Sequence, residues 1–264
     1  MDVYGLIGHP VAHSSSPAVF DAAFDTVGID AQYVLFPVEP SNLATAIEGA
    51  EALGIDGLNV TIPHKESVLM HAQPTEAAAA IGGANVLDLG EDPIVAANTD
   101  ASAMVTVLDI LDLPPTEALV LGAGGAARAY VHALVNTGWQ VHVANRTVKR
   151  AAELADRYAA VNSHPLDAAA DLASTVSLIV NATSVGLETD VSPLPADAIE
   201  STHVVIDAVY EPDPTRLLTD ATAAGATTVS GRRLLLEQAV GAFEIWRDES
   251  VPRAVMASAL GLEL

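Results

Sequence analysis

Lys65 and Asp100 are the residues of this sequence best suited to acid–base chemistry on a small substrate. The chain contains only two lysines, and Lys65 follows a strand-like segment that ends at Pro63. A ketone that accepts a hydride develops negative charge on its oxygen, and a neighbouring ammonium group can stabilise that charge and donate the proton. Asp100 can pair with Lys65, orient it and accept a substrate hydroxyl. The alternative interpretation is a surface salt bridge of little energetic consequence, and these residues alone do not decide between the two.

A glycine-rich turn matches the G-x-G-x-x-G/A fingerprint of dinucleotide-binding sites. It follows the strand-like run 118–121 and precedes a helix-like segment, which is the context that the fingerprint requires. The first glycine permits a tight turn, the second lets the backbone approach a pyrophosphate, and free N–H groups at the helix start face the anion. The turn predicts a dinucleotide cofactor bound by Gly122, Ala123, Gly124, Gly125 and Ala126, with Ala127 keeping the helix close to the sheet.

The residues after the next predicted strand, 140–143, indicate whether the cofactor is NAD or NADP. In NAD enzymes an acidic residue at this position binds the ribose hydroxyls. This turn contains no carboxylate, and three of the eleven cationic residues fall within five positions. Such a cluster favours the 2′-phosphate of NADP, because a guanidinium group can fork onto phosphate oxygens. The alternative is a cationic first helical turn paired with Glu153 and Asp156. The predicted phosphate-side residues are Asn145, Arg146, Thr147, Lys149 and Arg150.

Hydroxyl and amide side chains gather at three other strand ends in the first hundred residues, where open α/β sheets bind their ligands. The segments are 13–17, 59–65 and 98–100. Each is a weak signal alone, because a serine before a proline is commonly a helix cap, and Ser16 with Pro17 fits that simpler interpretation. No histidine spacing resembles a metal site such as H-E-x-x-H, so we expect no metal.

Short apolar runs alternate with alanine-rich helical stretches, which is typical of α/β folds with a mostly parallel sheet. We expect strands near 3–7, 33–36, 58–60, 85–87 and 94–97, then a second series near 118–121, 140–143, 178–180 and 203–207. The predicted helices are 17–27, 126–137, 150–158 and 234–248. The predicted fold class is therefore α/β with two domains: residues 1–100, completed by helices at about 237–264, and a Rossmann-type domain at 101–236.

The charge of the chain limits the class of its partners. Its 34 acidic residues against 11 Lys plus Arg give a net charge of −23, which disfavours nucleic acid because such binding needs clustered cations. No apolar run approaches the roughly 18 to 20 residues of a membrane span, and no basic leader is present. The sequence has no cysteine, which fits a cytoplasmic protein. We interpret the acidic composition as adaptation to high salt, where screening shortens the range of self-repulsion.

The chain resembles the shikimate dehydrogenase family along nearly its whole length. The resemblance rests on ordered motifs: Gly8-His9-Pro10, His13-Ser14-Ser15-Ser16-Pro17, Asn59-Val60-Thr61-Ile62-Pro63-His64-Lys65, Gly83-Ala84-Asn85, Asn98-Thr99-Asp100, the glycine turn, Asn145-Arg146-Thr147, Asn181-Ala182-Thr183-Ser184, and Gly231 with Gln238. It implies an N-terminal α/β substrate domain and a Rossmann-type NADP domain with substrate in the cleft between them. It also implies reduction of 3-dehydroshikimate to shikimate, in aromatic amino acid biosynthesis, by pro-R hydride from NADPH.

The resemblance also implies a role for each matched residue. Lys65 and Asp100 become the catalytic pair, and Thr183, Ala208 and Gly231 lie near the nicotinamide half of NADP(H). The substrate-binding residues are Ser14, Ser16 and Thr61 for the carboxylate, Asn85, Asp100 and Gln238 for the hydroxyls, and Tyr210. Departures from the family pattern are Ser15 in place of a lysine, Val86 in place of a threonine, and Arg232 and Arg233 after Gly231.

The sequence leaves alternatives open. One is an NAD-dependent quinate/shikimate dehydrogenase of the same fold, which the arginine cluster disfavours; folate-linked dehydrogenases share the glycine turn but do not need the serine turn. The other is a non-catalytic protein that binds cofactor or metabolite. The expected partner is a small-molecule substrate, and the sequence leaves open whether the chain forms a homodimer.

Overall fold

Residues 1–247 and 249–263, which the computed structural model describes, form two six-stranded sheets, one in each of two structural units. Unit 1 comprises residues 1–103 and the segment from residue 235 onward, and unit 2 comprises residues 104–234. The unit boundaries therefore fall within helices α4 (Asp100–Leu111) and α9 (Gly231–Trp246). Residues 248 and 264 lie outside the described residues. The predicted helix 234–248 and the predicted C-terminal segment at about 237–264 end at these two positions.

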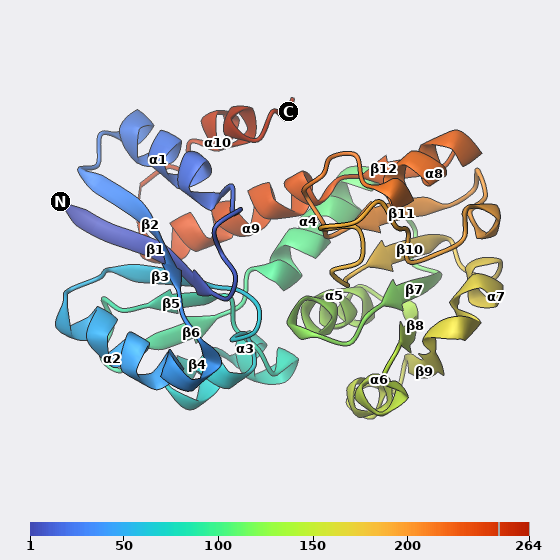
Figure 1. The fold of residues 1–264 in the computed structure, drawn as a ribbon, viewed down its shortest axis with the longest axis horizontal. Helices are drawn as coiled ribbons and strands as arrows, with labels where there is room; N and C mark the ends of the chain where they lie inside the picture. The colour runs from blue at the N-terminus through green and yellow to red at the C-terminus, as the bar shows by residue number, and fades with distance from the viewer. Residues whose placement is uncertain (248, 264) are drawn as a thin grey trace. The chain divides into compact units, whose positions relative to one another are not determined.

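The sheet of unit 1 is mixed and has the strand order β2-β1-β3-β5-β6-β4. Strand β5 runs antiparallel to both of its neighbours, β3 and β6, whereas the other pairs are parallel. Figure 1 shows helices α1 and α10 of this unit side by side. The elements are β1 (Asp2–Gly8), α1 (Ser16–Val27), β2 (Ala31–Pro37), α2 (Leu43–Ala52), β3 (Gly57–Val60), β4 (Gln73–Pro74), α3 (Glu76–Ile81), β5 (Val86–Asp88), β6 (Val95–Ala97) and α10 (Arg253–Ala259), with short 3₁₀ turns at Pro40–Asn42 and Ser67–Met70.

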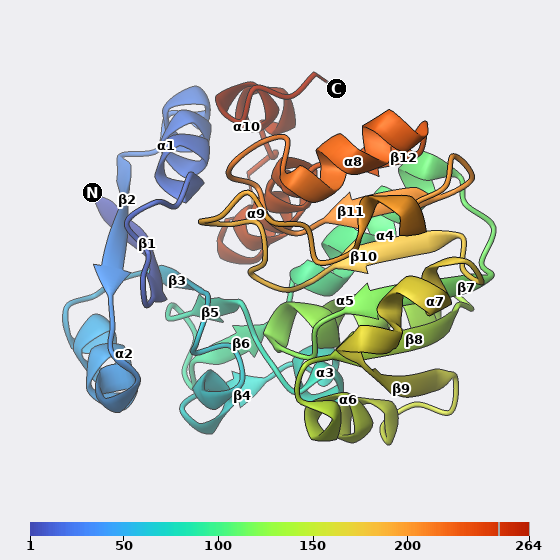
Figure 2. The same ribbon diagram turned by 45° about the vertical axis from the view of Figure 1, so that its right-hand side comes forward.

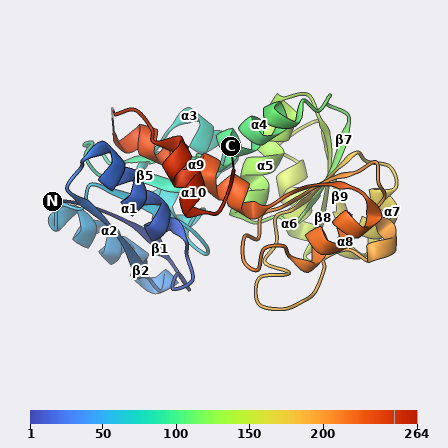
Figure 3. The same ribbon diagram turned by 90° about the horizontal axis from the view of Figure 1, so that it is seen from above.

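The sheet of unit 2 is wholly parallel, with the strand order β12-β11-β10-β7-β8-β9 that Figure 2 shows. Helices α5 and α6 cover one face and α7 and α8 the other (Figure 3), which is the doubly wound arrangement predicted from the sequence. The elements are β7 (Glu117–Leu121), α5 (Gly125–Asn136), β8 (Gln140–Asn145), α6 (Val148–Ala155), β9 (Val161–Pro165), α7 (Ala169–Ala173), β10 (Leu178–Asn181), β11 (Val204–Asp207), α8 (Arg216–Ala224) and β12 (Thr227–Val229), with 3₁₀ turns at Leu166–Ala168 and Ala196–Ala198.

Helix α9 supplies the core of unit 1 with two aromatic side chains from late in the chain. The ring of Trp246 lies 5.0 Å from that of Tyr4, and Phe243 lies 6.0 Å from Phe24. The indole N–H of Trp246 donates to the Leu87 carbonyl at 3.0 Å. A Cβ at Gly57 would lie 2.4 Å from the indole nitrogen, so only glycine fits beneath this ring. These contacts fix the end of α9 on the sheet of unit 1.

Candidate active site

Lys65 and Asp100 form a buried ion pair in unit 1. Lys65 follows strand β3, and Asp100 is the first residue of helix α4. The ammonium nitrogen lies 2.6 Å from Asp100 Oδ2, and the two side chains are 14% and 7% exposed. This burial removes the interpretation of a surface salt bridge. Lys65 stands in the turn after β3, where its carbonyl accepts from the Ala84 N–H at 2.8 Å. The orientation of the amine is thus held by both its backbone and its anionic partner.

Asp100 is the first residue of α4, and Asn98 orients it. The Asn98 side-chain oxygen accepts from the N–H groups of Asp100 at 3.1 Å and Ala101 at 3.2 Å, while its amide donates to the Gly83 carbonyl at 2.9 Å. Asn98 therefore caps α4 and ties it to the segment that precedes Asn85. This cap was not predicted, although an asparagine before a helical stretch is a recognisable signal for one.

Asn85 joins the ion pair to helix α9. Its amide nitrogen lies 3.1 Å from Asp100 Oδ1, 2.9 Å from Thr99 Oγ1 and 3.0 Å from Gln238 Oε1. An amide has two hydrogens, so these three acceptors compete for them. A ligand hydroxyl that draws one acceptor away leaves Asn85 fully hydrogen-bonded. The structure thus brings together four predicted site residues: Lys65, Asp100, Asn85 and Gln238.

Thr99 is a member of this cluster that the sequence analysis left without a role. Its hydroxyl donates to the Gln238 carbonyl at 2.9 Å, and its backbone N–H donates to Asn85 Oδ1 at 2.7 Å. A Cβ at Gly241 would lie 3.1 Å from the Thr99 methyl group, so α9 approaches Thr99 closely at this glycine. Its position within the motif Asn98-Thr99-Asp100 was the available signal.

Ser14, Ser16 and Thr61 lie around the end of β1. The Ser14 hydroxyl donates to Ser16 Oγ at 3.0 Å and accepts from the Ser16 N–H at 3.2 Å. Thr61 approaches the same strand end, since a Cβ at Gly8 would lie 2.3 Å from the Thr61 methyl group. Ser16 is the first helical residue of α1, and the N-cap position belongs to Ser15, whose side chain makes no capping hydrogen bond, so the simpler interpretation of Ser16 as a helix cap is wrong. No hydrogen bond among the described residues links these hydroxyls directly to Lys65.

The glycine turn of unit 2 has the conformation that its fingerprint requires. Gly122 has a φ of 109°, and a Cβ there would lie 3.0 Å from the Ala182 carbonyl oxygen. Gly124 precedes the first residue of α5, and a Cβ there would meet no described atom within 4 Å. The backbone at Gly124 is therefore open to a ligand, and the first N–H groups of α5 lack intrahelical acceptors. These features fit a dinucleotide pyrophosphate.

The predicted phosphate-side residues gather at the end of β8 and the start of α6. The Asn145 amide donates to the Thr147 carbonyl at 2.9 Å, which closes the turn. Arg146, Thr147, Lys149 and Arg150 are exposed. Lys149 lies 3.8 Å from Glu153, so the helix-pairing interpretation holds for this lysine. Arg146 forms no ion pair with any described residue and is available to an anion.

The remaining predicted residues also lie in unit 2. Thr183 follows β10 and Ala208 follows β11, and Gly231 packs against this second loop, since a Cβ there would lie 2.5 Å from the Val209 carbonyl oxygen. Tyr210 is half-buried and belongs to unit 2, whereas the other predicted substrate residues belong to unit 1.

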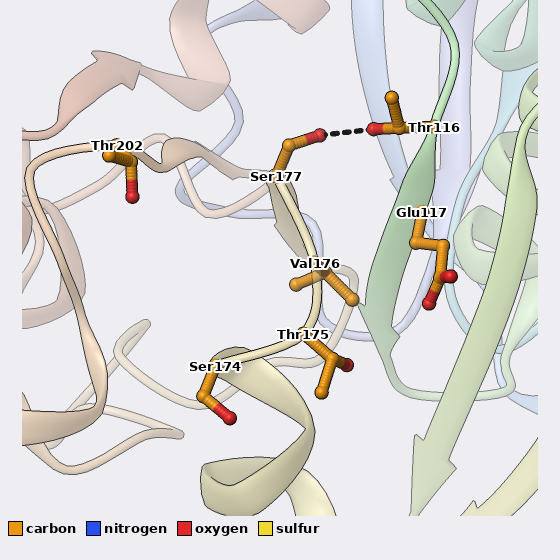
Figure 4. Close-up of a pocket in the computed structure, with 7 residues that line it drawn as sticks. All are labelled: Thr116, Glu117, Ser174, Thr175, Val176, Ser177 and Thr202. Carbon is orange, nitrogen blue, oxygen red and sulfur yellow. Dashed lines mark hydrogen bonds between the residues drawn. The ribbon is translucent and has the colours of Figure 1, made fainter.

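A shallow pocket in unit 2 lies at the amino ends of its strands, away from the glycine turn. Figure 4 shows its hydroxyl-rich lining, in which Ser177 Oγ and Thr116 Oγ1 are 2.7 Å apart. The glycine turn lies at the carboxyl ends of the same strands, so this pocket is not the cofactor site. Among the described residues no cluster of three potential metal ligands occurs, and no described helix is long and apolar enough to cross a membrane.

Family models, curated relatives and a solved structure that this chain resembles carry shikimate dehydrogenase names. The sequence matches the family model "Shikimate dehydrogenase substrate binding domain" over residues 6–87 and the model "Shikimate / quinate 5-dehydrogenase" over residues 106–189. It is 48% identical over 261 residues to the NADP(+) shikimate dehydrogenase of Natronomonas pharaonis, covering 98% of each chain. It is 49% identical over 253 residues to that of Haloarcula marismortui, covering 96% of each. The structure superimposes on shikimate 5-dehydrogenase of Thermus thermophilus, solved with NADP(H) and shikimate, with a TM-score of 0.91, 34% identity and 99% coverage of both chains.

Proposed function

Because this chain belongs to the shikimate dehydrogenase family, we infer that it is an NADP-dependent oxidoreductase that interconverts 3-dehydroshikimate and shikimate, with Lys65 and Asp100 at the reacting end. The observation that supports these roles best is the buried Lys65–Asp100 pair, held at 2.6 Å beside Asn85 and Gln238. An ammonium group largely shielded from water interacts strongly with developing negative charge, which is what the reduction of a ketone requires.

Each residue of the cluster has a task in this reaction. The hydroxyls of Ser14, Ser16 and Thr61 hold the substrate carboxylate by charge–dipole hydrogen bonds. Asn85, Asp100 and Gln238 accept from or donate to the substrate hydroxyls, and Tyr210 is a further substrate-binding residue. These contacts fix the substrate so that its carbonyl oxygen lies at Lys65 Nζ. Holding the reacting groups in this orientation lowers the entropic cost of reaching the transition state. Lys65 then donates a proton to that oxygen and becomes a neutral amine, and Asp100 keeps the lysine side chain aligned during the transfer.

The cofactor would be held by the residues of unit 2 whose geometry fits it. Gly122 to Ala126 and the first turn of α5 would bind the pyrophosphate, and Arg146, Thr147, Lys149 and Arg150 with Asn145 would surround the 2′-phosphate. Thr183, Ala208 and Gly231 would border the nicotinamide. When bound, NADPH supplies the hydride that reduces the ketone.

A direct assay tests this function. Absorbance at 340 nm is followed in molar-range KCl with shikimate and NADP, shikimate and NAD, and quinate with each cofactor. Strong preference for shikimate with NADP is the expected result. Activity mainly on quinate with NAD would overturn the phosphate-site assignment while keeping the fold, and a folded preparation without any turnover would favour a binding protein instead.

Replacing Arg146 with alanine is expected to raise KM for NADP by about 10- to 100-fold, because a charge-assisted contact to the 2′-phosphate is lost. KM for NAD should stay within about twofold, because NAD has no phosphate at that position. Arg216→Ala is the matched control: Arg216 also lies in unit 2 and is exposed, but it pairs with Asp220 at 2.9 Å. Equal losses with both cofactors would contradict a phosphate contact at Arg146.

Salt should stabilise the fold, because the chain has a net charge of −23 and resembles, at 48% and 49% identity, relatives from halophilic organisms. The Debye length falls from about 30 Å at 0.01 M to about 3 Å at 1 M salt, which shortens the repulsion among carboxylates. We expect the melting temperature, followed by circular dichroism, to rise steadily between these KCl concentrations. Maximal stability in dilute buffer would contradict the interpretation of salt adaptation.

A further inference from the structure

Asn181 and Asp207 form a buried polar pair at the carboxyl edge of the sheet in unit 2. They are the last residues of β10 and β11, they face each other in the strand register, and both are 0% exposed. The Asn181 amide donates to Asp207 Oδ1 at 2.8 Å. Neither residue belongs to the predicted catalytic, substrate-binding or cofactor-binding set. A buried carboxylate is costly to a fold unless its neighbours compensate it, so its presence calls for an explanation.

Asp207 is held by neutral donors alone. Besides Asn181, the Val209 N–H donates to Oδ1 at 3.0 Å and the Thr215 hydroxyl donates to Oδ2 at 2.7 Å. No described residue forms an ion pair with it. Burial raises the pKa of this carboxyl, and the hydrogen bonds from Thr215, Val209 and Asn181 oppose that shift. The carboxylate thereby links Val209, in the loop after β11, to Thr215, the N-cap of α8.

Asn181 organises the neighbouring loop in the same way. Its side-chain oxygen accepts from the Thr183 N–H at 3.1 Å and from the Thr183 hydroxyl at 2.7 Å. Its amide also donates to the Val185 carbonyl at 3.2 Å, and the Val185 N–H donates to Thr183 Oγ1 at 3.1 Å. The side-chain oxygen of Asn181 and one of its amide hydrogens thus shape residues 182–185, while the other amide hydrogen binds Asp207.

The two loops held by this pair make the close contacts that glycine permits at the cofactor site. The loop after β10 packs on Gly122, where a Cβ would lie 3.0 Å from the Ala182 carbonyl oxygen. The loop after β11 packs on Gly231, where a Cβ would lie 2.5 Å from the Val209 carbonyl oxygen. A shift of the loop after β10 would therefore change its contact with the Gly122 backbone. A shift of the loop after β11 would likewise change its contact with the Gly231 backbone.

We infer that Asp207 is a positioning residue of the cofactor site, acting through Val209 and Asn181 and held by the Thr215 hydroxyl. This inference rests on the proposed function, because it takes the two loops to border NADP(H). Its effect falls on cofactor binding, since Thr183 and Ala208 stand in these loops while the cluster around Lys65 belongs to unit 1.

Thr215→Val tests the inference with a change that is mild for the fold, because it removes the donor to Asp207 and keeps the side-chain shape. Thr75→Val is the matched control: Thr75 caps α3 through Ala78 N–H at 3.2 Å, as Thr215 caps α8 through Leu218 N–H at 3.3 Å, but Thr75 has no contact with Asp207. Thr215→Ser restores the hydroxyl. NADPH affinity is measured by fluorescence titration, and KM for shikimate is measured at saturating NADP.

We expect Thr215→Val to weaken NADPH binding by about tenfold, the effect of one lost hydrogen bond to a charged group. KM for shikimate should change less than twofold, Thr75→Val should bind NADPH like the wild type, and Thr215→Ser should recover most of the affinity. Asp207→Asn should weaken NADPH binding at least as much as Thr215→Val. Wild-type affinity in folded Thr215→Val, or an equal loss in Thr75→Val, would overturn the inference. Failure of the wild-type protein to oxidise shikimate would instead overturn the proposed function. The NADPH titration measures cofactor affinity without turnover, so the two failures can be told apart.

Discussion

Lys65→Met is expected to lower kcat for shikimate oxidation by about 10²- to 10⁴-fold, the usual contribution of a positioned acid–base group. Methionine keeps the length of the side chain but has neither charge nor proton to offer. NADPH affinity should remain within about twofold of the wild type, because the cofactor-binding residues belong to unit 2. Steady-state kinetics together with NADPH titration by fluorescence measure both quantities on the same preparation. Near-normal turnover would remove Lys65 from the chemistry.

Lys65→Arg separates the two ways in which Lys65 can act. A guanidinium keeps the positive charge but stays protonated across the accessible pH range, so it stabilises a developing oxyanion without releasing a proton. A rate close to that of Lys65→Met would mean that proton transfer is the main contribution. A rate close to that of the wild type would mean that a fixed charge is sufficient.

Asp100→Asn is expected to lower kcat/KM by about 10²- to 10³-fold, because it affects both the amine and the substrate. The carboxylate accepts from Lys65 through Oδ2 and from Asn85 through Oδ1. An amide in its place offers only one oxygen, so either Lys65 or Asn85 loses its acceptor. The ammonium also stays buried without its anion, which costs stability as well as rate. Initial rates and the melting temperature should both fall.

Asp30→Asn is the control for this second variant. Asp30 is also an aspartate of unit 1 with a cationic partner, the N-terminal amine at 3.4 Å, but its side chain is 87% exposed. An exposed pair contributes little, so neither rate nor melting temperature should move measurably. If Asp100→Asn behaved like Asp30→Asn, the buried pair would have no part in turnover.

Much of the fold could be predicted from local sequence patterns. The glycine turn between β7 and α5 stands where its fingerprint predicts, because strand, turn and helix are encoded within ten consecutive residues. The runs at 85–87 and 94–97 are strands as predicted, but their directions could not be read: β5 is antiparallel to both neighbours, and hydrophobic patterning does not encode strand direction. The last long helix begins at Gly231 rather than near 234, since Ser230 Oγ accepts from the Arg232 N–H at 3.2 Å and sets an earlier start.

The site was harder to predict than the fold, because its contacts join distant parts of the chain. The bond between Asn85 and Gln238 spans 153 positions, and no periodicity links such residues. The resemblance to a family named both of them, but it did not show that Thr99 holds the backbone of Gln238. The Asn181–Asp207 pair was also missed: each residue stands at the end of an apolar strand, and only the register of β10 and β11 places them opposite each other.

Unit 1 is made from both halves of the polypeptide, and this arrangement has a consequence for its synthesis. A ribosome releases residues 1–103 long before residues 235–263, so the nascent substrate unit waits without Phe243, Trp246 and Gln238. During that interval Tyr4 and Phe24 lack the aromatic rings that later cover them, and Asn85 lacks Gln238. Unit 2, by contrast, is continuous in sequence and can fold as soon as it emerges. Unit 2 is therefore complete first, and the unit that contains Lys65 is completed only after residues 235–263 have been synthesised.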